Sequence, residues 1–375
     1  MMKKVILAII AFIIITVVSV ILIMSNKGQQ QEKIGMQPIR TAPTGDKKLE
    51  KSITIGAVGD ILIHDRVYND AQTSKKTYNF KPMLEKIKPE LLKPDILLAN
   101  QETIVAGTNI GLSGYPAFNS PHEIADALKE AGVDIVTTAN NHALDRGPDG
   151  QMKSLAYLKK IKMPYVGTFT SAKDQQTIRI MEKNGIKVAF LSYTYGTNGI
   201  PIPNKQPYIV NIIDKNNMKK ELARAKKQAD IIVMGIHWGN EYERFPNTEQ
   251  KELAQFLVNE GANIIFGGHP HVLQHMEWLT NKQGKKALVV YSLGNFLSGQ
   301  DEDYRNIGGL ASVTIKKTIK NNQAEIQLEN PSFFPTYNYS NKEKDYELRP
   351  LKEANDKNLK HSYKEIMDHM MQELH

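Results

Sequence analysis

The sequence contains no cysteine among its 375 residues. This absence excludes disulfides, zinc sites built from thiolates, thiol nucleophiles and anchoring through a lipidated cysteine. Any metal ion must therefore be bound by His, Asp, Glu or Asn side chains. The chain also has no basic block, because its net charge of +8 comes from lysines spread along the whole length. We therefore expect a solvated, lysine-rich surface and no nucleic-acid partner.

One long apolar run, at residues 5–24, contains only Thr16 and Ser19 as polar residues. As a helix it would cross about 30 Å of hydrocarbon, and no small-residue cleavage pattern follows it. We expect an uncleaved single-pass anchor, with a short cytoplasmic N-terminus at 1–4 and a polar linker at 25–51. The flanking positive charges are nearly balanced. Because large domains translocate largely regardless of such charges, we expect the main domain outside the cell membrane.

From Ser52 onward the sequence has the pattern of an α/β domain. Short apolar runs such as ITIGAV, DILLAN, VAFLSY and DIIVMGI recur, and stretches of helical periodicity lie between them at 122–131, 150–160, 217–228 and 248–260. Continuous apolar runs indicate buried parallel or mixed strands. LASVTIKKTI and QAEIQLE predict a hairpin around residues 321–322. We assign 52–340 to this domain and 341–375 to a charged tail, helical from about residue 357.

Polar side chains follow six of the predicted strands at the point where each strand ends. In open α/β sheets the ligand crevice lies at these carboxyl ends. A single histidine there is more often structural, but agreement among six ends predicts a site for one or two divalent ions such as Mn²⁺, Zn²⁺ or Mg²⁺. The residues are Asp60, Asn100, Glu102, Asn140, Asn141, His142, His237, Glu241, His269, His271 and Asn295.

Some of these residues invite a more detailed hypothesis. Asp60 or Glu102 could bridge two ions. We place His269 and His271 on one side of an extended segment, where both imidazoles face the same cavity. The glycine-rich stretch 107–121 is expected as a loop over the cavity, whose side chains either contact substrate or pack as an ordinary surface loop.

The order of the strand-end residues resembles a known pattern. Asp60, Asn100-x-Glu102, Asn141-His142, His237 and His269-x-His271 resemble the calcineurin-like metallophosphoesterases. More narrowly, GAVGDILIHD, ANQET, TANNHALDRGPDG, IHWGNEY, GGHPHVLQ and YSLGNFL resemble the CapA-type poly-γ-glutamate capsule biosynthesis proteins over about residues 52–300. The resemblance implies a four-layer α/β/β/α sandwich. It also implies a membrane-anchored role in making or exporting poly-γ-glutamate, an anionic polymer, with membrane-bound synthase subunits as partners.

The resemblance implies roles for individual side chains as well. Asn141 is then an amide-oxygen metal ligand, and His142 lies beside the reacting oxygen as an acid or as a donor to developing charge. Asp145 either orients His142 or only begins the next helix. The phosphoesterase pattern has Asp-x-His at the first strand, whereas Leu62 occupies that position here. The nearest histidine, His64, would have to reach the site from the following loop.

Three functions stay open at this stage. The first is a metal-dependent hydrolase or transferase that acts on a phosphoester or an amide of the polymer or cell wall. The second is a non-catalytic accessory subunit that binds polyglutamate or synthase subunits, and the third is a structural metal site in a surface hydrolase unrelated to capsule. In the catalytic hypothesis, the strand-end residues left for substrate contact are Asn100, Asn140, Glu241 and Asn295.

Overall fold

The computed structural model describes residues 48–321, 323–357 and 359–374. The expected anchor at 5–24 and most of the expected linker lie outside these residues. Within the described part of the chain, no helix is long and apolar enough to cross a bilayer. The first strand, β1, begins at Leu49, slightly ahead of Ser52 where the apolar pattern starts.

The first sheet is mixed and has eight strands, in the order β16-β15-β14-β1-β4-β5-β6 with β13 also paired to β1. The strands are β1 (Leu49–Leu62), β4 (Ile96–Gln101), β5 (Ile135–Thr137), β6 (Tyr165–Val166), β13 (Asn295–Ser298), β14 (Ile307–Lys320), β15 (Gln323–Asn341) and β16 (Lys344–Pro350). β1, β4, β5 and β6 are parallel, so their carboxyl ends lie at one edge. β14 and β15 pair antiparallel, which confirms the predicted hairpin.

The second sheet has six strands in the order β11-β12-β10-β9-β8-β7. They are β7 (Arg179–Lys183), β8 (Ile186–Thr194), β9 (Ile231–His237), β10 (Ile264–Gly268), β11 (Leu273–Thr280) and β12 (Lys286–Leu293). The four central strands are parallel, and β11 and β7 are antiparallel at the two edges. β2 (Gln72–Ser74) and β3 (Thr77–Tyr78) form a small separate ribbon.

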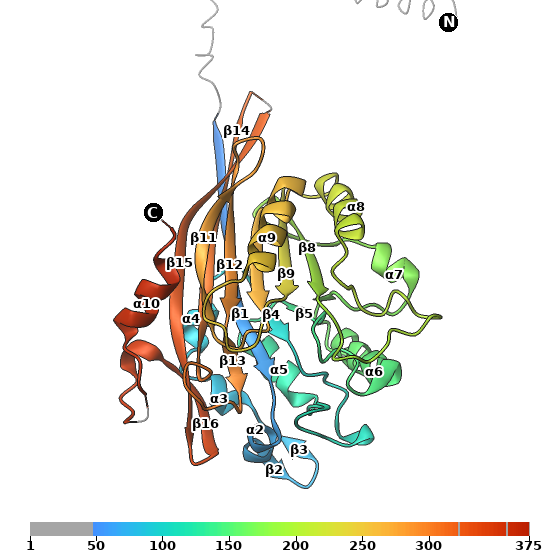
Figure 1. The fold of residues 1–375 in the computed structure, drawn as a ribbon, viewed down its shortest axis with the longest axis vertical. Helices are drawn as coiled ribbons and strands as arrows, with labels where there is room; N and C mark the ends of the chain where they lie inside the picture. Colours follow the sequence, from blue (N-terminus) through green and yellow to red (C-terminus); the bar gives the residue numbers. More distant parts are fainter. Residues whose placement is uncertain (1–47, 322, 358, 375) are drawn as a thin grey trace, which may run out of the picture. The chain divides into compact units, whose positions relative to one another are not determined.

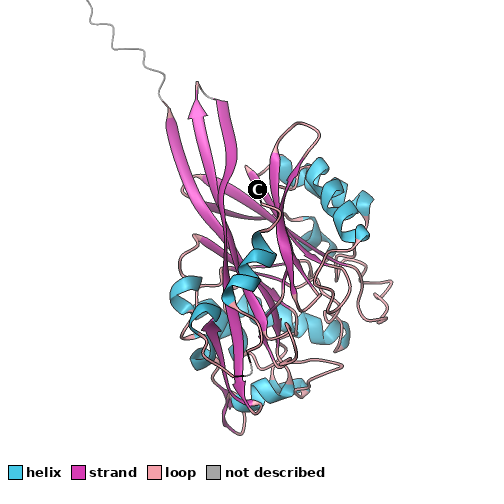
Figure 2. Ribbon diagram, turned by 60° about the vertical axis from the view of Figure 1, so that its left-hand side comes forward, coloured by secondary structure: helices cyan, strands magenta, loops and turns pink. Residues whose placement is uncertain are grey.

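Helices cover the outer faces of both sheets (Figures 1 and 2). α2 to α6 pack on the first sheet through side chains such as Leu128 and Leu155, and α8 and α9 pack on the second through Leu222 and Leu257. The helices are α2 (Asp65–Asp70), α3 (Lys81–Leu84), α4 (Lys88–Leu91), α5 (Glu123–Glu130), α6 (Gly147–Lys160), α7 (Ala172–Gln176), α8 (Lys215–Lys226), α9 (Thr248–Glu260) and α10 (Tyr363–Met371). α5, α6, α8 and α9 match the four predicted helical stretches.

The inner faces of the two sheets pack against each other. Ile55 and Leu98 of the first sheet share one buried core with Phe190 and Val233 of the second. Strands buried on both faces need continuous apolar runs, which is the pattern in the sequence. Burying each such side chain contributes about 1.5–3 kcal/mol. The mixed α/β fold expected from the sequence is confirmed.

The C-terminal segment belongs to the same domain. β16 pairs with β15 and so extends the first sheet beyond residue 341. α10 buries Ile366 and Met370 in the core between the sheets. The helix expected from about residue 357 therefore begins at Tyr363, and the segment expected as a charged tail adds both a strand and a helix to the fold.

The backbone of β1 passes unusually close to Gly294 where it delivers Asp60. The Asp60 N–H donates to the Gly294 carbonyl at 2.9 Å. A Cβ atom at Gly59 would lie 1.9 Å from that same oxygen. We expect Gly59→Ala to lower the free energy of unfolding by about 3 kcal/mol, because the chain must shift to relieve the overlap. Urea denaturation measures the change.

Gly196→Ala is the matched control, because a Cβ atom at Gly196 would meet nothing within 4 Å. It should leave stability unchanged or raise it slightly. An equal loss of stability in the two variants would contradict the close approach of β1 to Gly294.

Candidate metal centre

The polar ends of the two sheets meet at one place. Asp60 lies in β1 and Glu102 follows β4, while His237 closes β9 and His269 and His271 follow β10. All five side chains are buried. Their ligand atoms form two groups, Glu102 with His269 and His271, and Asp60 with Glu102 and His237; within each group the atoms lie within 4.8 Å of one another. Glu102 belongs to both groups, so it is placed where it could bridge two ions.

Neighbouring amides hold this cluster in place. The Asn100 amide donates to Asp60 Oδ1 at 2.7 Å. Asn141 Oδ1 lies 2.9 Å from His237 Nε2, so this amide oxygen is directed at the cluster. On the other side, His271 Nδ1 lies 3.2 Å from Asp60 Oδ2. These contacts fix the directions of the side chains before any ligand binds.

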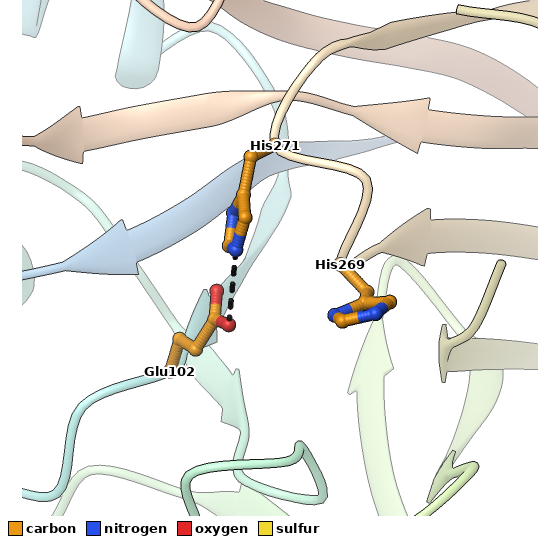
Figure 3. A group of neighbouring side chains, drawn as sticks. All are labelled: Glu102, His269 and His271. Atoms are coloured by element: carbon orange, nitrogen blue, oxygen red, sulfur yellow. Dashed lines mark ion pairs between the residues drawn. The ribbon is translucent and has the colours of Figure 1, made fainter. Parts of the chain in front are cut away.

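Glu102 is the least satisfied member of the cluster. His237 Nε2 lies 3.4 Å and His271 Nε2 3.8 Å from Oε1, yet neither carboxylate oxygen has a hydrogen-bond partner among the described residues. Figure 3 shows His271 directed at Glu102, with His269 to one side. Burial, reinforced by the charge of Asp60, raises the pKa of Glu102 to about 8.

A divalent cation fits this set of residues. A buried carboxylate without donors is strongly unfavourable, and a cation between the carboxylates and imidazoles removes that penalty. His269 Nδ1 also has no hydrogen-bond partner among the described residues. Oxygen and imidazole nitrogen ligands without thiolate suit Mn²⁺ or Zn²⁺, and Mg²⁺ less well because of the imidazoles.

The cluster places its histidines in two different charge states. Burial lowers the pKa of both His237 and His269 to about 3, so both imidazoles are neutral at pH 7 and keep a lone pair for a cation. Burial also acts to lower the pKa of His271, but the Glu102 and Asp60 carboxylates outweigh it and raise that pKa to about 9. His271 therefore carries the compensating positive charge in the metal-free protein.

The backbone at the two histidines differs from the expectation. His269 has φ of +97° and His271 has φ of +58°, so the segment is a left-handed turn and the extended segment predicted here is wrong. Non-glycine residues in this region are strained by about 1–3 kcal/mol each, a cost that is typical of functional sites. Gly268 precedes the turn, and a Cβ atom there would lie 2.6 Å from Asp60 Oδ1.

His142 lies beside the cluster in the loop after β5. Its Nδ1 is 2.7 Å from Asp145 Oδ2, which also accepts the Phe118 N–H at 2.7 Å. The Phe118 ring packs edge-on against the imidazole, with ring centroids 4.8 Å apart. Of the two roles considered for Asp145, orienting His142 is the one that its contacts support. The loop at 107–121 covers His142 through Phe118.

Three of the four residues expected to contact substrate make polar contacts within the site. Asn100 is bonded to Asp60, and both polar atoms of Asn140 are taken up by backbone groups of the surrounding loops. Asn295 is fully buried and lies 3.1 Å from a cluster imidazole. Glu241 alone among the four is exposed. These contacts hold the three asparagines in place within the site, and their contact with substrate stays a prediction.

His64 does not join either group of ligand atoms. Its Nδ1 lies 3.0 Å from the Leu62 carbonyl and accepts the Gly299 N–H at 3.1 Å. Burial lowers the pKa of His64 to about 4, so it is neutral. The side chain contacts the backbone of the loop after β1 and lies outside both groups of ligand atoms.

Tyr195 is a site residue that the sequence reasoning missed. It follows β8, and its ring centroid lies 4.6 Å from that of His269. The side chain is 46% exposed and can meet a ligand. Burial, together with the charge of Glu241, raises the pKa of Tyr195 to about 12, so it keeps its proton. Tyr195 could have been found from the sequence, because it lies just after the apolar run VAFLSY, as the other strand-end residues lie after theirs.

The chain is similar to a described protein family and to several known proteins. A profile of the family described as "Bacterial capsule synthesis protein PGA_cap" matches residues 54–300. Capsule biosynthesis protein CapA of Bacillus anthracis is 32% identical over 302 residues, which cover 77% of this chain and 68% of that protein. PGA biosynthesis protein CapA of Bacillus subtilis is 32% identical over 197 residues, 52% of this chain and 50% of that protein. A putative 5'-nucleotidase structure from Staphylococcus aureus aligns over 84% of this chain and 57% of that chain, with 16% identity and a TM-score of 0.47.

Replacing Glu102 with a neutral residue measures how much its buried carboxylate lowers the stability of the metal-free protein. The folded-state pKa of Glu102 is about 8 against an ordinary 4.5, so its contribution to stability is lost as pH rises between these values. His271, raised from 6.5 to about 9, adds a further loss above pH 6.5. We expect the metal-free protein to lose stability from pH 6.5 to 9, and Glu102→Gln to be about 1–3 kcal/mol more stable than wild type at pH 8.

Denaturation with urea in the presence of a chelator measures this difference. Glu221→Gln is the control, because Glu221 is also buried but accepts the Tyr193 hydroxyl and lies 3.8 Å from Arg224. That variant should not gain stability. A Glu102→Gln protein that is less stable than wild type at pH 8 would show that the carboxylate is satisfied without a cation.

Proposed function

This chain belongs to the PGA_cap family of bacterial capsule synthesis proteins, and from that premise we propose that it serves poly-γ-glutamate capsule formation through a metal-dependent hydrolytic or transfer step. The observation that carries the proposal is Glu102, a buried carboxylate without hydrogen-bond donors that is shared by two groups of ligand atoms. The proposal includes the finer classification of the fold as a metallophosphoesterase-like sandwich. The layering of two sheets between helices supports it.

The residues of the cluster could hold one or two divalent ions. Glu102 belongs both to the group with Asp60 and His237, beside which the Asn141 oxygen lies, and to the group with His269 and His271, so one or two divalent ions can be held. A bound ion would lower the pKa of a water molecule and polarise the bond under attack. The neutral imidazoles of His237 and His269 are already in the form that binds cations.

We propose that His142 transfers the proton in the reaction. Asp145 accepts the hydrogen bond from Nδ1, which fixes the tautomer and leaves Nε2 as the atom that gives or takes a proton. Phe118 holds the imidazole ring edge-on and keeps water away from one side of it. His142 would therefore assist the leaving group or stabilise developing charge.

The proposal extends to location and partners. We place residues 5–24 in the cell membrane as a single-pass anchor, with the domain outside the cell, because this run of the sequence is long and apolar enough to span. The anionic polymer and the membrane-bound synthase subunits are the proposed partners. The names of the Bacillus relatives, a capsule biosynthesis protein and a PGA biosynthesis protein, support these assignments.

Removing two imidazoles tests the metal centre directly. We expect His269→Ala/His271→Ala to lose bound Mn²⁺ or Zn²⁺ and to abolish hydrolysis of a generic phosphodiester while the domain stays folded. Metal content of the full chain in detergent is measured by mass spectrometry, and folding by circular dichroism. His275→Ala is the control, because His275 is buried in β11 outside both ligand groups. Unchanged metal content in the double variant would rule the centre out.

The same double variant separates catalysis from an accessory role. If the activity is needed, cells that carry this variant in place of the wild type make less capsule. Normal capsule output from a protein that binds no metal would favour the non-catalytic accessory subunit and contradict the catalytic proposal.

Asp145→Asn tests the proton path without touching the metal ligands. We expect the turnover rate to fall by about 10²–10⁴, because the amide no longer fixes the His142 tautomer. Metal content should stay at the wild-type level, and the pH dependence of the remaining activity should change. Asp149→Asn, on the exposed first turn of α6, is the control. If the two variants have equal activity, Asp145 has no part in the reaction.

A further inference from the structure

A cavity of about 670 Å³ opens beside the metal centre, at the carboxyl ends of β8 and β9. Tyr195 and Trp238 line one part of it, and Glu249 and Leu253 of α9 line another. Its volume falls in the range of pockets that hold small ligands, roughly 300–1,000 Å³. His269 lines this cavity and also belongs to a group of ligand atoms, so the two sites are continuous.

The wall of the cavity is acidic. The lining contains three carboxylates, those of Glu241, Glu249 and Glu252, and a single ammonium group, that of Lys215. Glu249 and Glu252 have no ion-pair or hydrogen-bond partner among the described residues. The field of Glu241 also reaches into the metal centre, where it acts on Glu102 and all three cluster histidines. The cavity therefore favours a positively charged group.

Two further features point to a ligand in this cavity. His269 is 4% exposed, and its Nδ1 has no hydrogen-bond partner among the described residues. Tyr195 presents a 46% exposed aromatic ring beside it. An aromatic face next to carboxylates is a favourable surface for an ammonium group.

A γ-linked glutamate chain offers one such group. Every residue of the polymer carries an α-carboxylate, but only the amino-terminal residue also carries an ammonium, on the same carbon. The three glutamates attract that ammonium and Lys215 in the lining can pair with the neighbouring α-carboxylate, whereas interior residues bring a carboxylate without an ammonium. Resting on the proposed function, we infer that this cavity binds the amino-terminal residue of poly-γ-glutamate, with its ammonium among Glu241, Glu249 and Glu252 and its γ-amide toward His269. The protein then engages the polymer from its end, and interior segments are excluded.

Binding of short oligomers tests this inference without any need for turnover. Tetra-γ-glutamate with a free amino end and the same peptide with an acetylated amino end are titrated into the full chain in detergent, with a chelator present. We expect the free peptide to bind at least about tenfold more tightly. In Glu249→Gln/Glu252→Gln this preference should shrink to about threefold or less. Glu260→Gln is the control, because Glu260 closes α9 outside the cavity lining and pairs with Lys219 at 3.0 Å.

Equal affinity for the free and acetylated peptides would overturn the inference, and so would failure of both to bind. Neither result would bear on the metal centre, because metal content and phosphodiester hydrolysis are measured separately. Conversely, a protein without hydrolytic activity could still bind the peptide with the free amino end more tightly. A preference that survives in Glu249→Gln/Glu252→Gln would also contradict the assignment to this cavity.

Discussion

Two buried carboxylates, Asp60 and Glu102, meet where the carboxyl ends of both sheets converge, and the rest of the site is arranged around their charge. Asp60 has donors in Asn100 and His271. Glu102 has none among the described residues. Burial without donors makes the charged form of Glu102 unfavourable, and its pKa rises to about 8. The fold tolerates it because the surrounding imidazoles can share a cation, or in its absence a proton, with these carboxylates.

The architecture serves this arrangement in two ways. β1 lies inside the first sheet and β9 and β10 inside the second, so their ends deliver ligands from rigid elements. Glycines at 59 and 268 allow the backbone to approach where a side chain would not fit. The strained turn at His269 and His271 directs two imidazoles inward, and packing between the sheets outweighs that strain. The acidic cavity at His269 continues the same edge toward solvent.

Much of this could be predicted from the sequence, because parallel strands end at one edge of a sheet. Asp60, Glu102 and His237 each follow a buried apolar run, and topology alone brings them together. The polar contacts that Asn140 and Asn295 make inside the protein could not be predicted from the sequence, because their partners come from distant segments. The left-handed backbone after β10 also depends on tertiary contacts.

The central claim is that Glu102 is a metal ligand shared by two groups. Anomalous diffraction from crystals grown with Mn²⁺ tests it most directly, because it locates the ion without reference to any activity. The account predicts a peak at about 2.0–2.4 Å from the Glu102 carboxylate, with His269 and His271 or Asp60 and His237 completing the coordination. An ordered cluster without a peak, or a peak held by other residues, would contradict it.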